Sequence, residues 1–173
     1  HCEERGGLAH LRRHFLIRCF HWVLAVGIVV NYEFLESGGE PHEWLGWALG
    51  ALVLLRIAAG FISRGDASFA GLNLSPRLVL QDLRSLAGTY PEHENHSAAG
   101  SWMIVLMLTL VVLLAITGWM QDLDAFWGED WLQNIHEWLA HALVALAALH
   151  VLAVVFIQFG HGIPLLRRIG FGR

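Results

Sequence analysis

The sequence predicts an all-α membrane protein, a four-helix transmembrane bundle with both termini in the cytoplasm. Of its 173 residues, 55% are hydrophobic and only 15% are charged. One small soluble domain cannot hide that much apolar surface from water. The apolar residues fall into four long stretches, and every basic residue lies on one side of them. The same composition, with four Pro and two Cys, excludes a disordered tail and a disulfide framework.

Four stretches are long enough to cross a bilayer as helices. A spanning helix needs about 20 mainly apolar residues. Two short loops join the first stretch to the second and the third to the fourth, and we expect the whole chain, 1–173, to form one domain. The four predicted spans are residues 15–35, 44–62, 101–120 and 135–159.

The connection between the second and third spans is longer, about residues 63–100. Ser75-Pro76 begins a helix-like stretch within it that continues from Arg77 to Ala87. We interpret this stretch as a helix that lies on the membrane surface or faces a partner.

The basic residues set the predicted orientation. All eleven are Arg, and neither short loop contains one. Because cytoplasmic segments of membrane proteins carry the excess of Lys and Arg, both termini and the long connection should be cytoplasmic. The eleven are Arg5, Arg12, Arg13, Arg18, Arg56, Arg64, Arg77, Arg84, Arg167, Arg168 and Arg173.

Acidic residues show the reverse distribution. Nine of the fifteen lie on the predicted outer side, where there is no Arg. A soluble partner on that side should be basic or neutral where it docks. The alternative interpretation is that these carboxylates only make the loops soluble.

Four of the eleven His occupy matched depths in the predicted spans. His136 and His150 are fourteen residues apart, so they lie within about 40° on one helix face and roughly 21 Å apart along its axis. His42 also lies at the outer mouth, and His21 lies at the depth of His150. We call His42 and His136 the outer pair, and His21 and His150 the inner pair. His141 points about 140° away from His136.

Two imidazoles that face each other across a bundle can hold one metal centre. A single His inside a span could be an ordinary core residue, but ionisable side chains in a membrane are usually functional. Zinc or copper more often recruits Cys or carboxylate ligands. The sequence has no CxxCH, the attachment motif of covalent haem c. The best fit is therefore two non-covalent haems b, each with two His ligands to iron.

Two Gly and two Arg could complete these haem sites. Gly46 and Gly50 lie roughly on the face of His42 and could let a porphyrin lie flat, but they also form a GxxxG helix-packing pattern. Arg18 and Arg56 could pair with the propionates of the inner haem. The alternative for both Arg is that they reach toward lipid headgroups.

Four short motifs resemble the bacterial cytochrome b561 family, which overlaps the cytochrome b subunits of nickel-iron hydrogenases. The likeness covers nearly the whole chain, and the fourteen-residue His spacing in the last span is its most specific part. It implies two haems b, one on the outer pair and one on the inner pair. The motifs are Phe20-His21-Trp22, His42-Glu43-Trp44-Leu45-Gly46, Ile135-His136-Glu137 and Leu149-His150-Val151.

These observations predict a cytochrome that carries electrons across the bilayer between the quinone pool and a redox partner. Iron with two His ligands has no open position for oxygen chemistry. We expect a quinone beside the inner haem, near Arg18, His14 and the long connection. The partner would be a basic periplasmic electron carrier or a dehydrogenase or hydrogenase subunit, and nucleic acid is not expected.

The sequence also allows three other functions. The chain could be an enzyme in its own right, a superoxide oxidase that reduces quinone, although the acidic outer side should repel a superoxide anion. It could instead be the haem-bearing membrane anchor of a hydrogenase or dehydrogenase. A His-lined cation transporter fits less well, because the acidic residues lie outside the spans.

Overall fold

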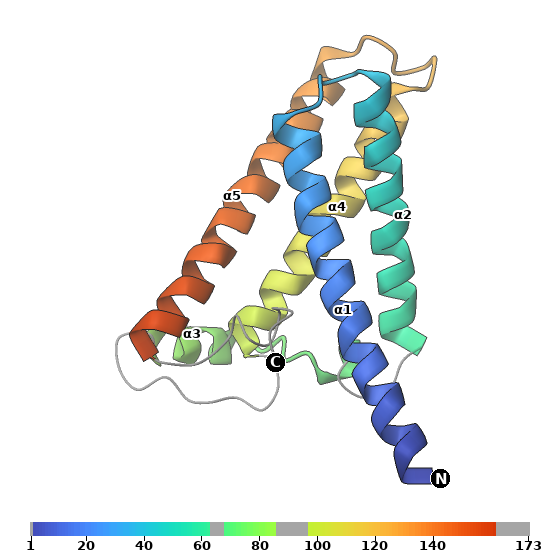
Figure 1. Ribbon diagram of the computed structural model, residues 1–173. Helices are drawn as coiled ribbons and strands as arrows, with labels where there is room; N and C mark the ends of the chain where they lie inside the picture. The colour runs from blue at the N-terminus through green and yellow to red at the C-terminus, as the bar shows by residue number, and fades with distance from the viewer. Residues whose placement is uncertain (1, 63–67, 86–96, 162–173) are drawn as a thin grey trace.

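The computed structural model describes residues 2–62, 68–85 and 97–161. Within this part of the chain the structure is all-helical and has no strand (Figure 1). Four long helices run side by side, and a short helix lies across one end of the bundle. In chain order the elements are α1 (Cys2–Glu33), α2 (Glu40–Ile62), η1 (Phe69–Gly71), α3 (Pro76–Ser85), α4 (Ala98–Gln121) and α5 (Asp130–His161).

The four long helices are long and apolar enough to cross a membrane. This confirms the prediction of an all-α, four-span protein. The qualifying segments are Phe15–Glu33, Glu40–Ile62, Ala98–Gln121 and Asp130–Gly160.

The helices begin earlier than the hydropathy of the sequence predicts. Helix α2 starts at Glu40 rather than 44, and α5 starts at Asp130 rather than 135. Acidic residues in a first turn favour a helix through its dipole, and Pro41 suits the first turn because the N–H it lacks would have no partner there. Counting apolar residues misses such polar turns. As a result, His42 lies within α2 instead of before it.

Packing follows the order α1 on α2, α2 on α4, and α4 on α5, with α3 against α4. Among the described residues, α1 and α5 are not closely packed against each other. The small buried core is formed by Val53, Val111 and Leu143, where α2, α4 and α5 meet. Many large apolar side chains are exposed on the outside of the bundle, as expected where lipid rather than water surrounds the helices.

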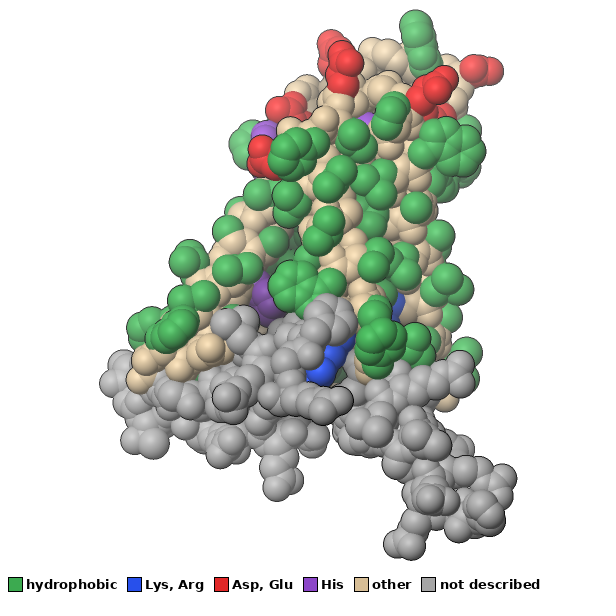
Figure 2. Space-filling view, in the orientation of Figure 1, with side chains coloured by type: hydrophobic (Ala, Val, Ile, Leu, Met, Phe, Trp, Pro, Cys, Tyr) green, Lys and Arg blue, Asp and Glu red, His purple; other side chains and the backbone are tan. Residues whose placement is uncertain are grey.

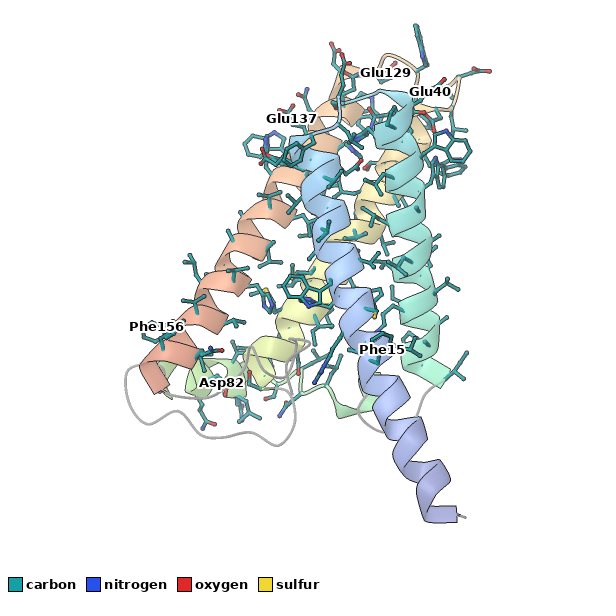
Figure 3. All side chains as sticks on the ribbon, in the orientation of Figure 1. Phe15, Glu40, Asp82, Glu129, Glu137 and Phe156 are labelled. Carbon is teal, nitrogen blue, oxygen red and sulfur yellow. The ribbon has the colours of Figure 1, made fainter. Side chains whose placement is uncertain are left out.

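Charged side chains separate to opposite ends of the bundle. Figure 3 places Glu40, Glu129 and Glu137 at one end and Asp82 at the other, and Figure 2 shows the acidic side chains of the visible face at the first end. We call this the acidic end, and we call the end that carries α3 the arginine end. The acidic end holds Glu33, Glu36, Glu40, Glu43, Asp122, Asp124, Glu129, Asp130 and Glu137.

The arginine end carries the described Arg side chains Arg18, Arg56, Arg77 and Arg84. The predicted separation of charge therefore holds for the described residues. The cytoplasmic location of the arginine end stays a prediction. The described side chains do not include the other Arg: Arg5, Arg12, Arg13, Arg64, Arg167, Arg168 and Arg173.

The segment before α3 is tied to the first turns of α4. The backbone N–H of Asn73 donates to Oγ of the fully buried Ser101 over 3.1 Å. The indole N–H of Trp102 donates to the carbonyl of Leu74 over 3.2 Å. Helix α3 therefore lies across the bundle at a fixed place, close to where the long connection predicted a helix. The predicted end of that helix, residues 86–87, lies outside the described residues.

Asp82 should be the residue that holds α3 most strongly. Its carboxylate is only 7% exposed and accepts a 3.0 Å hydrogen bond from the backbone N–H of Ala99, in the first turn of α4. A hydrogen bond to a charged group contributes about 1.5–3 kcal/mol. We therefore expect Asp82→Ala to lower the thermal unfolding midpoint of the purified protein. The exposed neighbour Gln81 is the matched control, and an equal loss in Gln81→Ala would contradict this role.

Candidate functional site

The structure brings together the two histidine pairs that depth in the sequence suggested. The ring centroids of His42 and His136 are 6.3 Å apart, and those of His21 and His150 are 6.4 Å apart. Helix α5 supplies one imidazole to each pair, while α1 and α2 supply the others. All four side chains are half-buried. The bundle therefore carries two separate pairs of facing imidazoles.

The spacing within each pair suits a shared metal. A bond between a metal and an imidazole nitrogen is about 2 Å long, so two imidazoles on one metal have ring centroids about 6 Å apart. Among the described residues, no three His, Cys, Asp or Glu side chains gather as a metal-binding group. A zinc site normally uses three or four protein ligands. A donor set of two imidazoles instead fits haem iron, because the porphyrin supplies the remaining ligands.

In the outer pair, both Nδ1 atoms have hydrogen-bond partners. His42 Nδ1 lies 3.2 Å from the backbone oxygen of Asn31. A carbonyl oxygen can only accept, so His42 Nδ1 carries the proton and its Nε2 remains free to bind a metal. His136 Nδ1 lies 2.8 Å from Oγ1 of Thr117. Metal-binding imidazoles commonly donate their second N–H in this way, which fixes the ring and its tautomer.

The inner pair has a different environment. Nδ1 of His21 is buried and has no hydrogen-bond partner among the described residues. Its ring packs edge-on against that of Trp22, with centroids 5.8 Å apart. The two pairs therefore share their spacing but differ in what holds each ring.

The two predicted Gly have different surroundings. A Cβ added at Gly50 would lie 2.9 Å from the Cβ of Ala115, so this Gly permits the close approach of α2 and α4. At Gly46 the nearest atom would be Nδ2 of Asn31, 3.8 Å away, which is ordinary contact. The GxxxG alternative thus fits Gly50 better than Gly46. A role for either Gly beside a porphyrin stays a prediction.

The predicted Arg lie toward the arginine end. The guanidinium carbon of Arg56 is 5.1 Å from the centre of the Phe69 ring, a cation–π contact between α2 and η1. Arg18 is half-buried on α1, one turn before His21. Their pairing with propionates stays a prediction. The side chain of His14, named for the quinone site, lies outside the described residues.

His141 joins neither pair, as its angular position on the helix predicted. Its exposed ring lies edge-on to that of Tyr32 on α1, with centroids 6.1 Å apart, and to that of Trp138, at 6.4 Å. The ring is therefore exposed on the bundle and also contacts a neighbouring span, α1.

Sequence reasoning missed the residues that surround the outer pair. Thr117 comes from α4, the one span without a His, and a Cβ added at its neighbour Gly118 would lie 3.5 Å from Cε1 of His136. The available signal was one of the few polar side chains within a mostly apolar span. Asn31 contributes a backbone oxygen, which no residue pattern reveals.

Four spanning helices with two facing imidazole pairs define a multi-pass membrane protein built like a membrane cytochrome. The family model for prokaryotic cytochrome b561 matches residues 12–172, nearly the whole chain. The chain therefore belongs to the prokaryotic cytochrome b561 family, in agreement with the resemblance of its motifs. Membership implies that it binds haem b. No curated protein and no solved structure matches the chain.

Proposed function

We propose that the protein binds two haems b and carries electrons across the bacterial inner membrane between a membrane quinone and a redox partner. The observation that supports this most is the presence of two facing imidazole pairs at different depths of one bundle. The fourteen residues between His136 and His150 correspond to roughly 21 Å of helix, a large part of the hydrocarbon thickness.

Each pair would hold one haem. His42 and His136 would bind the outer haem, and His21 and His150 the inner haem. Haem b supplies a one-electron redox couple when bound. Two imidazoles on each haem would favour electron transfer over oxygen chemistry. Val53, Val111 and Leu143 form the small apolar core where α2, α4 and α5 meet.

The ends of the bundle suggest which partner meets which side. Nine carboxylates gather at the acidic end, which would attract a basic electron carrier or the basic surface of a dehydrogenase or hydrogenase subunit. The same charge repels superoxide, an anion, and so favours exchange with a protein over superoxide oxidation. The quinone would bind beside the inner pair, toward the arginine end and Arg18.

The haem content of the purified protein tests this function. We expect a reduced-minus-oxidised spectrum of low-spin haem b and two haems per chain by the pyridine haemochrome assay. Covalent haem is not expected, because the chain lacks CxxCH. A stoichiometry of zero or one would contradict the two-haem proposal.

A further inference from the structure

We propose that Thr117 is a positioning residue for His136, and that its hydroxyl lowers the redox potential of the outer haem independently of the inner one. This inference rests on the proposed two-haem function. Helix α4 supplies no histidine to either pair, yet its Thr117 contacts a ring of the outer pair at 2.8 Å.

The contacts of the Thr117 hydroxyl allow two arrangements of the proton on His136, of which one leaves Nε2 free. Oγ1 lies 2.9 Å from the carbonyl of Leu113 and 3.2 Å from that of Leu114, and the side chain is only 8% exposed. A hydroxyl has one hydrogen to donate and can accept others, whereas a carbonyl only accepts. When the hydroxyl donates to Leu113, it accepts from Nδ1–H of His136. Nε2 of His136 is then unprotonated and free to bind a metal.

The opposite arrangement is incompatible with metal binding through Nε2. If the hydroxyl donated to Nδ1, the proton of the neutral imidazole would lie on Nε2 and block that position. Metal binding through Nε2 and donation from Nδ1–H to Thr117 therefore both require the tautomer of His136 with its proton on Nδ1. The ring also lies close to Gly118, where an added Cβ would make an ordinary 3.5 Å contact with Cε1 of His136.

The hydrogen bond should change the chemistry of its haem as well as its position. An imidazole that donates its second N–H is a stronger electron donor to the metal it binds. Stronger donation favours oxidised iron over reduced iron, which lowers the potential. In the inner pair, Nδ1 of His21 is buried and has no such partner within the described part of the chain. The carboxylates of the acidic end act in the same direction on the outer pair, because negative charge also stabilises the oxidised state.

Four variants of the haem-loaded protein test this inference in a spectroelectrochemical titration. Thr117→Val keeps the shape of the buried side chain but removes the hydroxyl, whereas Thr117→Ser retains it. Thr109→Val makes the same change at an exposed position of the same helix and serves as the matched control. His136→Ala should remove the outer haem. The wild-type potential that is absent from the titration of this variant is therefore the potential of the outer haem.

We expect Thr117→Val to raise the potential of the outer haem alone, and Thr117→Ser and Thr109→Val to keep both wild-type values. Loss of the outer haem in Thr117→Val, with both haems present in Thr117→Ser, also supports a positioning role. The inference is overturned if Thr117→Val leaves both potentials unchanged or shifts both equally, or if Thr117→Ser behaves like Thr117→Val. Failure of the proposed function itself is separate, because it appears in the wild type as fewer than two haems.

Discussion

Replacing His150 with alanine should leave the protein with one haem b per chain instead of two. The ring of His150 faces His21 at a centroid separation of 6.4 Å, and an alanine would leave His21 as the one imidazole of this pair to hold the proposed inner haem. We expect the inner haem to be lost and the outer haem to keep its spectrum. His136→Ala should give the complementary result, because that ring faces His42 at the other pair. The measurement is the pyridine haemochrome stoichiometry combined with the reduced-minus-oxidised spectrum.

His141→Ala is the matched control for both variants. This residue lies on the same helix, but its ring contacts Tyr32 and Trp138 instead of another histidine. Both haems should remain in His141→Ala. A loss of haem in this variant, together with two haems in His150→Ala, would show that the ligands have been assigned to the wrong residues.

Gly50→Ala should clearly destabilise the bundle. The added methyl would lie 2.9 Å from the Cβ of Ala115, and neither atom is the end of a flexible side chain that can turn away. Helices α2 and α4 would have to separate, and overpacking of this kind typically costs about 1–3 kcal/mol. The expected result is a lower thermal unfolding midpoint of the purified protein.

Gly46→Ala provides the comparison, because the nearest atom to its added methyl would be Nδ2 of Asn31 at 3.8 Å. Its unfolding midpoint should stay at the wild-type value. An equal loss of stability in the two variants would show that the contact with Ala115 is not what makes Gly50 necessary. The haem content of Gly46→Ala would also report whether this position makes room for a porphyrin.

The helices and the pairing of the histidines could be predicted because, in a membrane protein, the depth of a residue in the bilayer follows from its position along a spanning helix. A spanning helix has a known length, so position in the sequence gives depth. Two His at one depth on different helices, such as His21 and His150, then become candidates for contact. The charge separation was predictable for the same reason, since loops alternate between the two sides.

The surroundings of the rings could not be predicted in this way. His42 relies on the backbone oxygen of Asn31, and every residue has such an oxygen. The contact of Thr117 with His136 depends on the rotation of α4 about its own axis, which hydropathy does not determine. That His21 Nδ1 has no hydrogen-bond partner among the residues described is equally a property of the packed bundle. The helix starts at Glu40 and Asp130 were missed because polar first turns are stabilised by the helix dipole.

Among the described residues, the first span, α1, and the last, α5, are the two neighbours that are not closely packed against each other. Packing links α1 to α2, α2 to α4 and α4 to α5, whereas α1 and α5 meet through aromatic rings, His21 with His150 and Tyr32 with His141. A group bound between His21 and His150 would therefore also connect α1 to α5. Moving α1 away from α5 breaks no backbone hydrogen bond, since each helix forms its backbone hydrogen bonds within itself. Release of that group should consequently spread α1 from α5 while the helices themselves stay folded.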